Sequence, residues 1–360
     1  MIASISIDEK VVFAERQSPR DHAFHSLRIS RVVDETADAR SFVLDVPAEL
    51  ADAFAYRPGQ FVTHRVWIDG RPHLRCYSMS SSPDVDDEFR VTVKRVAGGV
   101  VSNWMIDNLR AGDTIDTTCP AGLFCLPPGE GDGDVVAFAG GSGITPVISL
   151  AKTALAATSR RVSLLYANRD RDSIIFDTLL DRLRDQYPDR LGVVHRLDVE
   201  HGFIDEEAVR AFAENDAGAD YFICGPPPFM DIVESTLLAT GVDADRIHIE
   251  RFTPAAAASP TVESSTTDAC QVTIELGGRT DTVEHHPGTT ILQTARELGM
   301  APPFSCESGS CATCMAKLVE GEVSMFVNNA LTDDELDEGW VLTCQSVPTT
   351  PSVHVVYEEG

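Results

Sequence analysis

The segment Cys306-Glu307-Ser308-Gly309-Ser310-Cys311-Ala312-Thr313-Cys314 brings three cysteines close together, and a fourth, Cys344, follows further along the chain. The C-x4-C-x2-C…C spacing is that of four thiolate ligands to a [2Fe–2S] cluster. Cys306 and Cys311 can hold one iron from the two arms of a tight loop, and Cys314 and Cys344 can hold the other. The small polar residues between them suit a loop whose backbone N–H groups point at the sulfurs and help set the potential.

Zinc is the alternative metal for such a group. Structural zinc usually takes two C-x2-C halves, and only one is present here, which favours the iron–sulfur cluster. The other cysteines are scattered singly along the chain, which does not indicate a disulfide framework. They are Cys76, Cys119, Cys125, Cys224 and Cys270. Residues 1–20 lack the basic start and apolar core of a secretory signal, so we expect a cytoplasmic protein with reduced thiols.

Charge and hydropathy exclude two classes of partner. Lys and Arg total 29 against 56 Asp and Glu, giving a formal charge of −27 and a pI near 4.6. This balance argues against nucleic acid or an anionic membrane bound through a broad basic surface. No apolar run approaches the roughly 18 residues of a membrane span. We therefore expect neither nucleic acid nor a membrane as a partner.

The pattern of the chain changes twice, which predicts three domains of different fold. Residues 25–130 carry short alternating runs with turn signals between them, such as 41–46, 60–67 and 89–96, and predict an antiparallel β-barrel. Residues 131–252 alternate strand and helix patterns and predict a doubly wound α/β sheet. An N-terminal tail (1–24) and an Ala/Ser/Thr/Pro-rich linker (253–267) flank these two units. Residues 268–360 form the third unit, with the cysteine group.

Two short motifs in the predicted barrel suit a flavin. In Arg75-Cys76-Tyr77-Ser78, the arginine can pair with a phosphate, the tyrosine can lie against an isoalloxazine ring, and the serine can reach the N5 edge. In Gly99-Val100-Val101-Ser102-Asn103-Trp104, a tight turn with Ser102 at a helix start offers free amides to a pyrophosphate. The alternatives are an ordinary strand surface for the first motif and an ordinary N-cap for the second.

Two motifs in the predicted α/β unit suit a nicotinamide dinucleotide. Gly140-Gly141-Ser142-Gly143-Ile144-Thr145-Pro146 lies between a strand and a helix, where glycines let a pyrophosphate approach the backbone. It departs from the G-x-G-x-x-G fingerprint. Cys224-Gly225-Pro226 ends another strand and belongs at the carboxyl edge, where such sheets bind ligands. A purely structural cysteine is the alternative there.

Together these motifs resemble the ferredoxin–NADP reductase family over residues 25–252. The resemblance implies that Arg75, Tyr77 and Ser78 bind FAD and that the glycine turn binds the nicotinamide pyrophosphate. It also implies that Cys224-Gly225-Pro226 lies beside the nicotinamide. Glu250-Arg251-Phe252 matches the family's acid–x–aromatic ending, which implies that Phe252 is near the flavin and that Glu250 and Ser78 bond near N5. A solvated strand-end acid is the alternative for Glu250.

The third unit resembles a plant-type ferredoxin, which implies an α+β (β-grasp) fold. The order reductase, linker, ferredoxin is similar to oxygenase reductases of the ketosteroid 9α-hydroxylase and phenylacetyl-CoA epoxidase type, most of all the former. It implies an NADH-dependent enzyme that passes electrons through FAD and [2Fe–2S] to a terminal oxygenase. A di-iron monooxygenase reductase and a redox sensor or electron carrier are the alternatives. Glu307 departs from many relatives, which carry Arg there, and we expect this acid to lower the cluster's potential.

Cofactor choice and partner docking are predicted from local charge. The residues expected at the adenosine ribose conflict, because Asp170 or Asp172 could accept from a 2′-hydroxyl while Arg169 or Arg171 could pair with a 2′-phosphate. The resemblance to NADH-using reductases favours NADH and Asp170. The acidic run 333–338, close to Cys344, predicts a docking face for a basic patch on the oxygenase, with a solvated turn capped by Asp333 as the alternative.

Overall fold

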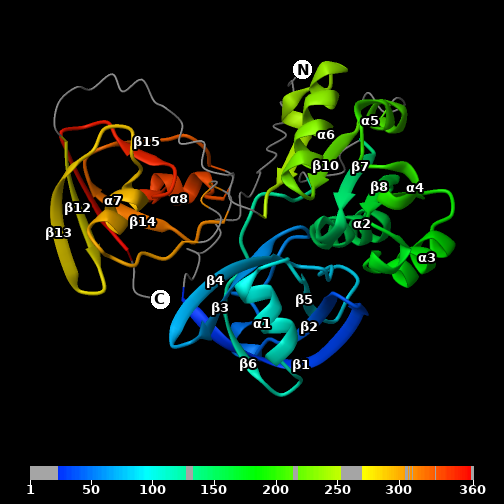
Figure 1. Ribbon diagram of the computed structural model, residues 1–360, viewed down its shortest axis with the longest axis horizontal. Coiled ribbons are helices and arrows are strands. Elements are labelled where there is room, and N and C mark those ends of the chain that lie inside the picture. The colour runs from blue at the N-terminus through cyan, green and yellow to red at the C-terminus, as the bar shows by residue number, and fades with distance from the viewer. Residues whose placement is uncertain are drawn as a thin grey trace, which may run out of the picture.

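The computed structural model describes residues 23–126, 133–213, 218–252, 270–304, 307, 309, 311–328 and 330–357. The predicted linker, the ligand Cys306, the loop residues Ser308 and Ser310, and all but the end of the predicted tail lie outside them. Three units are distinct in Figure 1, coloured blue to cyan, green, and yellow to red along the chain. Among the described residues, no helix has the length and apolar character needed to cross a membrane.

The first unit is a six-stranded antiparallel barrel with strand order β4-β3-β6-β1-β2-β5. Its strands are β1 (Phe24–Thr36), β2 (Ala39–Asp45), β3 (Phe61–Ile68), β4 (Arg71–Ser78), β5 (Phe89–Lys94) and β6 (Thr114–Thr118). The apolar side chains of each alternating run face inward: Val91 and Val93 of β5, for example, are fully buried. One helix, α1 (Val100–Asn108), follows β5. The predicted barrel is confirmed.

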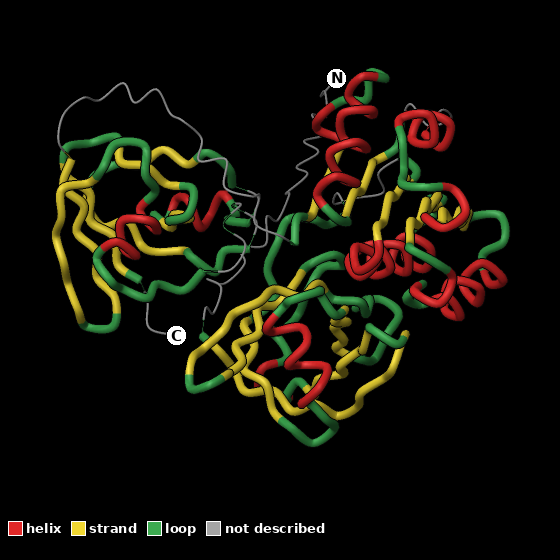
Figure 2. The backbone as a smooth tube through the Cα atoms, in the orientation of Figure 1, coloured by secondary structure: helices red, strands yellow, loops and turns green. Residues whose placement is uncertain are grey.

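The second unit is a parallel sheet of order β11-β10-β7-β8-β9, covered by helices on both faces (Figure 2). Its strands are β7 (Val135–Gly140), β8 (Val162–Asn168), β9 (Leu191–Leu197), β10 (Asp220–Cys224) and β11 (Ile247–Glu250). Its helices are α2 (Ile144–Ala157), α3 (Asp177–Gln186), α4 (Asp198–His201), α5 (Glu206–Ala213) and α6 (Pro227–Ala239). Every residue of β7 is buried, as expected for a central parallel strand.

The third unit has a mixed five-stranded sheet of order β13-β12-β18-β14-β16 and a small β15-β17 pair. The strands are β12 (Cys270–Leu276), β13 (Arg279–His285), β14 (Met315–Glu320), β15 (Val323–Met325), β16 (Trp340–Leu342), β17 (Ser346–Pro348) and β18 (Ser352–Val356). Helix α7 (Ile291–Glu297) packs its buried Ile291 and Ala295 into the core that Val272 and Val355 of the sheet also line. A short helix, α8 (Asp333–Asp337), precedes β16.

A polar seam joins the barrel to helix α2 of the α/β unit. Ser149 Oγ donates to the backbone oxygen of Ser81 at 2.6 Å, and Lys152 Nζ donates to that of Ser80 at 2.9 Å. Lys152 is only 4% exposed and also forms an ion pair with Asp86. The segment held in this way begins two residues after Ser78, so α2 fixes the chain that leaves the flavin motif.

Candidate redox site

Three of the four predicted cluster ligands come together in the third unit. Cys311 and Cys314 lie on the loop before β14, and Cys344 lies between β16 and β17; all three are buried. The thiols of Cys314 and Cys344 are hydrogen-bonded, and this bond, followed by burial, raises the pKa of Cys314 well above its usual value. Thr343 Oγ1 ties the two segments by donating to the backbone oxygen of Cys314 at 2.7 Å.

This arrangement fits an iron–sulfur cluster. Buried neighbouring thiols resist ionisation, whereas a bound cation deprotonates coordinating thiols outright. Among the described residues, no three side chains form a metal site by themselves, and Cys306 lies outside those residues. The loop is also shaped for close packing: Gly309 has φ +75°, and a Cβ there would lie 2.5 Å from the backbone oxygen of Val327.

Glu307 carries a charge that the protein balances. Its two carboxylate oxygens accept from Arg296 of α7 at 2.9 Å each, which is a bidentate ion pair. The Arg296 guanidinium also lies over the ring of Phe304, 3.7 Å from its centroid. This ion pair places a positive charge against the acid beside the first predicted ligand.

Strand β4 presents the flavin motif. Because side chains alternate along a strand, Arg75 and Tyr77 share one face, and Cys76 and Ser78 share the other. Ser78 is 1% exposed, and its hydroxyl has no hydrogen-bond partner among the described residues. Burial raises the pKa of Tyr77, which keeps its phenol neutral. A buried hydroxyl without a partner beside a neutral aromatic ring fits a bound flavin.

The predicted pyrophosphate turn differs from the expectation in one detail. Helix α1 begins at Val100 with Gly99 as its N-cap, so Ser102 lies inside the first turn and not at the cap. The Ser102 hydroxyl instead accepts from the backbone N–H of Val96 at 3.2 Å. A Cβ at Gly99 would lie 2.9 Å from Cβ of Val96 and 3.0 Å from the Ser102 oxygen. A glycine is therefore needed for this close packing.

The two nicotinamide motifs pack directly on each other. A Cβ at Gly143 would lie 2.0 Å from the backbone oxygen of Cys224, and one at Gly140 would lie 2.7 Å from the Pro226 ring. Thr145 and Pro146 belong to the buried start of α2, which begins at Ile144. The turn at Gly140–Gly143 and the segment Cys224–Pro226 thus form one continuous backbone surface at the carboxyl edge of the sheet, where such sheets bind ligands.

Glu250 lies beside Cys224 in the parallel register of β10 and β11. Burial, followed by the Glu250 charge, raises the pKa of Cys224 well above its usual value. Burial raises the pKa of the Cys125 thiol, in the barrel unit, to about 11, and the charge of Glu250 contributes to the same effect. Glu250 is 7% exposed and is not a solvated strand-end acid. Phe252 packs against the core of the α/β unit.

The loop predicted to meet the adenosine ribose makes more local contacts than its sequence suggested. Arg169 pairs with Asp38 of the barrel at 2.9 Å. The Asp170 carboxylate accepts from the backbone N–H of Ser173 at 2.9 Å and caps a short 3-10 turn. Arg171 and Asp172 are exposed and take no part in these two contacts. One basic and one acidic side chain of the loop therefore remain on its surface.

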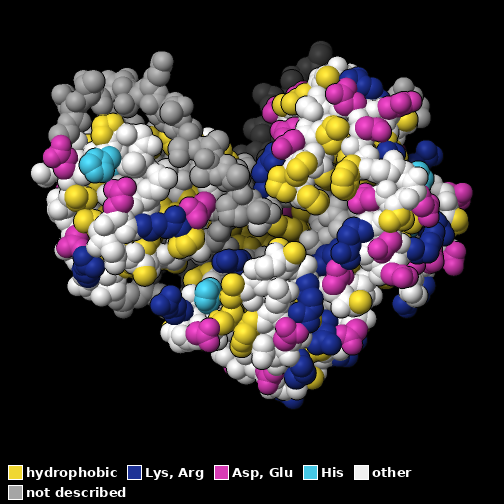
Figure 3. Space-filling view, viewed as in Figure 1, with side chains coloured by type: hydrophobic (Ala, Val, Ile, Leu, Met, Phe, Trp, Pro, Cys, Tyr) yellow, Lys and Arg dark blue, Asp and Glu magenta, His cyan; other side chains and the backbone are white. Residues whose placement is uncertain are grey.

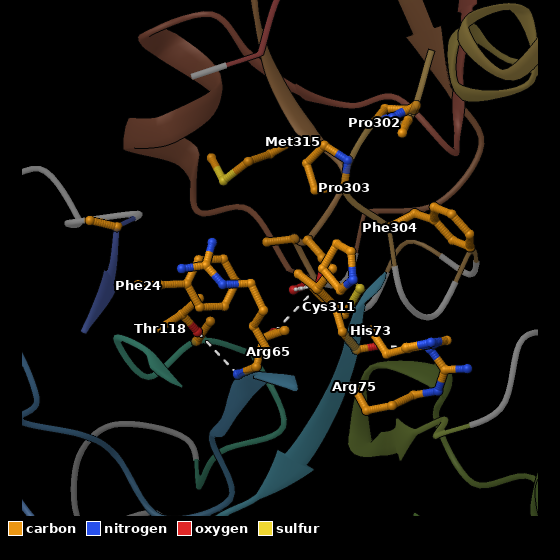
Figure 4. Close-up of a pocket in the computed structure, with 18 of the residues that line it drawn as sticks. Phe24, Arg65, His73, Arg75, Thr118, Pro302, Pro303, Phe304, Cys311 and Met315 are labelled. Carbon is orange, nitrogen blue, oxygen red and sulfur yellow. Dashed lines mark hydrogen bonds between the residues drawn. The ribbon is translucent and has the colours of Figure 1, made fainter. Parts of the chain in front are cut away.

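The barrel and the third unit meet at a predicted cluster ligand. Cys311 packs in one cluster with Phe61 and Ala121 of the barrel, and Cys76 packs against them. A cavity of about 1090 Å³ lies between the two units. Figure 4 shows Arg65, His73 and Arg75 on the barrel side and Pro302, Pro303 and Phe304 opposite, with Cys311 between them.

Three family models match the chain: an oxidoreductase FAD-binding domain at 26–125, an oxidoreductase NAD-binding domain at 138–235, and a 2Fe-2S iron-sulfur cluster binding domain at 274–349. The ferredoxin reductase component of 3-ketosteroid-9-alpha-monooxygenase from Mycolicibacterium smegmatis is 42% identical over 343 residues, covering 92% of this chain and 97% of that protein. The chain belongs to the family of ferredoxin–NADP reductase-like oxidoreductases fused to a [2Fe–2S] ferredoxin.

Two further proteins that resemble this reductase are named after other oxygenases. One component of 1,2-phenylacetyl-CoA epoxidase from Escherichia coli is 36% identical over 350 residues, covering 93% of the reductase and 98% of that component. Phthalate dioxygenase reductase shares the fold with a TM-score of 0.57 at 24% identity, covering 93% and 98% of the two chains. The reductase is an oxidoreductase with FAD-, NAD- and [2Fe–2S]-binding domains, as predicted.

One residue of the reductase that the motifs did not single out is Lys94, at the end of β5. Its Nζ lies 3.4 Å from the position of a Cβ at Gly141. Burial lowers the pKa of Lys94, and Asp38 opposes that effect. Lys94 therefore brings a positive charge from the barrel to the glycine turn, where we expect a pyrophosphate. The only sequence signal was a lysine closing an apolar strand.

The acidic run of the third unit is only partly a free surface. Thr332, not Asp333, caps α8, and Glu335 completes the capping box by accepting from the Thr332 backbone N–H at 2.9 Å. Glu335 is 7% exposed. Asp334 and Asp337 remain exposed. In Figure 3 acidic and basic side chains are mixed over the visible face of the other two units.

Proposed function

We propose that the reductase passes electrons from NADH through FAD and a [2Fe–2S] cluster to a terminal oxygenase, a Rieske 3-ketosteroid 9α-hydroxylase. The observation that carries the electron route is the packing of Cys311 on Phe61 and Cys76, because Cys76 lies between Arg75 and Tyr77 of the flavin motif. The 42% identity over 92% of the chain supports the choice of oxygenase. We place the reductase in the cytoplasm, where thiols stay reduced.

Each predicted residue receives a role in this proposal. FAD and the cluster would supply hydride acceptance and single-electron transfer. Arg75 and the N-terminus of α1 at Gly99 and Ser102 would bind flavin phosphates, and Tyr77 and Phe252 would contact the flavin rings. Ser78 and Glu250 would hydrogen-bond near N5. The cluster ligands would be Cys306, Cys311, Cys314 and Cys344.

The α/β unit would hold the nicotinamide dinucleotide. The turn from Gly140 to Pro146 would bind its pyrophosphate, and Cys224, with Gly225 and Pro226, would orient the nicotinamide toward the flavin. Asp170 would face the adenosine ribose. We divide the chain for these roles into a flavin unit (25–130), a nicotinamide unit (131–252) and a ferredoxin unit (268–360).

Reconstitution with purified oxygenases tests the partner. The reductase is mixed with NADH and either a 3-ketosteroid 9α-hydroxylase and its steroid or a phenylacetyl-CoA epoxidase and its thioester. We expect product, coupled to NADH oxidation, only with the hydroxylase. Turnover of the epoxidase alone would favour the second candidate, which the 36% identical relative supports. Flavin that stays oxidised after NADH is added would contradict the reductase assignment itself.

A further inference from the structure

Gln345 follows the last predicted cluster ligand and is almost fully buried, with 9% of its surface exposed. Its side-chain nitrogen donates to the backbone oxygen of Glu307 at 2.9 Å and to the Cys344 sulfur at 3.6 Å. An amide nitrogen has two hydrogens, so one group can make both bonds. Only the amide nitrogen, and not its oxygen, can donate to the Glu307 carbonyl, which fixes its orientation.

The backbone and stem of Gln345 are held as firmly as its amide. Its N–H donates to Leu342 at 2.8 Å, and its carbonyl accepts from Phe326 at 3.1 Å. Its Cγ packs on the ligand loop, 3.0 Å from the position of a Cβ at Gly309. The other end of the contact is also fixed, since the Glu307 side chain is paired with Arg296. A single side chain therefore joins the loop around Cys311 to the distant Cys344.

We propose that Gln345 is a positioning residue that closes the ligand loop onto Cys344 and donates an N–H to a ligand sulfur, which raises the cluster's reduction potential. This inference rests on the proposed [2Fe–2S] function. Hydrogen bonds to charged acceptors are stronger than those to neutral ones, and the reduced cluster carries one more negative charge. The Gln345 N–H should therefore stabilise the reduced form more than the oxidised form.

The test is a redox titration of the full-length holoprotein, followed by EPR of the reduced cluster. Gln345→Met keeps the length of the side chain and removes the donor, while Gln345→Glu keeps its shape and adds negative charge. We expect Gln345→Met to shift the one-electron equilibrium about tenfold toward the oxidised cluster, or about 59 mV, and Gln345→Glu to shift it further. Gln271→Met, on the exposed side of β12, is the matched control and should keep the wild-type potential.

Unchanged potentials in both Gln345 variants, or a higher one in Gln345→Met, would overturn the proposal. If neither variant keeps its cluster, pulsed EPR of the wild type with nitrogen-15 in its glutamine amides decides: a weakly coupled amide nitrogen supports the contact, and its absence overturns it. The titration needs neither NADH nor an oxygenase. A shift that fails to appear thus leaves the proposed function intact, whereas a wild type without any [2Fe–2S] signal would overturn both.

Discussion

Thr63 Oγ1 lies 3.4 Å from Thr313 Oγ1, although 250 positions separate the two residues in the sequence. Thr63 belongs to β3 of the barrel and Thr313 to the loop between two predicted ligands. Cys76 completes the contact, with its sulfur 3.7 Å from Thr313 Oγ1. The flavin motif and the cluster loop thus meet through small side chains, which keep the two backbones close.

Enlarging this contact should slow electron transfer between the units. Thr63 is 3% exposed, so Thr63→Arg overpacks the interface at a cost of about 1–3 kcal/mol, and about 1.4 kcal/mol already lowers a docking constant tenfold. Anaerobic stopped-flow should show slower cluster reduction after normal flavin reduction by NADH. Thr63→Ser, which keeps the hydroxyl and adds no bulk, should behave like the wild type. Equal cluster rates in all three proteins would exclude this contact as the route.

Removing a cluster ligand should abolish electron transfer through the cluster and leave flavin reduction by NADH intact. We expect Cys311→Ala and Cys344→Ala to lose the cluster absorption and all transfer to acceptors that need it. Flavin reduction by NADH should survive, because the residues proposed for it lie in the first two units. Cys270→Ala is the control, since Cys270 hydrogen-bonds to Thr350 at 3.1 Å and lies outside the ligand group. An intact rhombic EPR signal in Cys344→Ala would refute the ligand assignment.

The reductase should prefer NADH to NADPH by at least about tenfold in kcat/KM, or about 1.4 kcal/mol. Arg169 is tied to Asp38, which draws it away from a 2′-phosphate. Asp38→Asn should release Arg169 and raise kcat/KM for NADPH several-fold at most, since exposed ion pairs are worth about 0.2–1 kcal/mol. Steady-state kinetics with both cofactors checks this. Equal kcat/KM values for NADPH and NADH in the wild type would contradict the preference and would favour Arg169 or Arg171 as a ligand of the 2′-phosphate.

Electron delivery to the oxygenase should slow as salt rises from about 20 to 300 mM, because screening weakens charge steering. The double change Asp334→Asn, Asp337→Asn should lower the association rate and flatten its salt dependence. Glu335 is left intact because it belongs to the α8 cap. Glu206→Gln with Glu207→Gln, at two exposed positions of α5, removes the same charge elsewhere. Identical stopped-flow association rates for the two double variants would show that the acidic run is a solvated surface and not a docking face.

Sequence patterns located the strands and motifs well, because both depend on residues close together in the chain. The alternation around Val91, the buried run of β7 and the spacing of the cysteines each signal a structure without distant partners. Two capping boxes, Asp170 with Ser173 and Thr332 with Glu335, were also readable from their spacing. Asp170 caps its turn with the carboxylate that we propose for the ribose, and the cap of α8 lies at Thr332, one residue before the Asp333 cap that the sequence offered as an alternative.

Contacts between units could not be predicted in this way. Nothing in the order of residues pairs Arg169 with Asp38 or brings Lys94 to Gly141, since each pair is set by how two different sheets pack on each other. The Arg296–Glu307 pair was hidden for a related reason. It depends on the backbone at Glu307, whose φ of +52° is one that only a few non-glycine residues adopt.

The seam around Lys152 has a consequence for how this protein could be recombined. Exchanging the α/β unit for a foreign one would pack the carbonyls of Ser80 and Ser81 and the carboxylate of Asp86 against a surface without their partners on α2. An unpaired buried charge is among the costliest defects in a protein. The barrel and the α/β unit thus form one structural module. We expect that a foreign ferredoxin can be joined after Phe252 more readily than the nicotinamide domain can be exchanged for a foreign one.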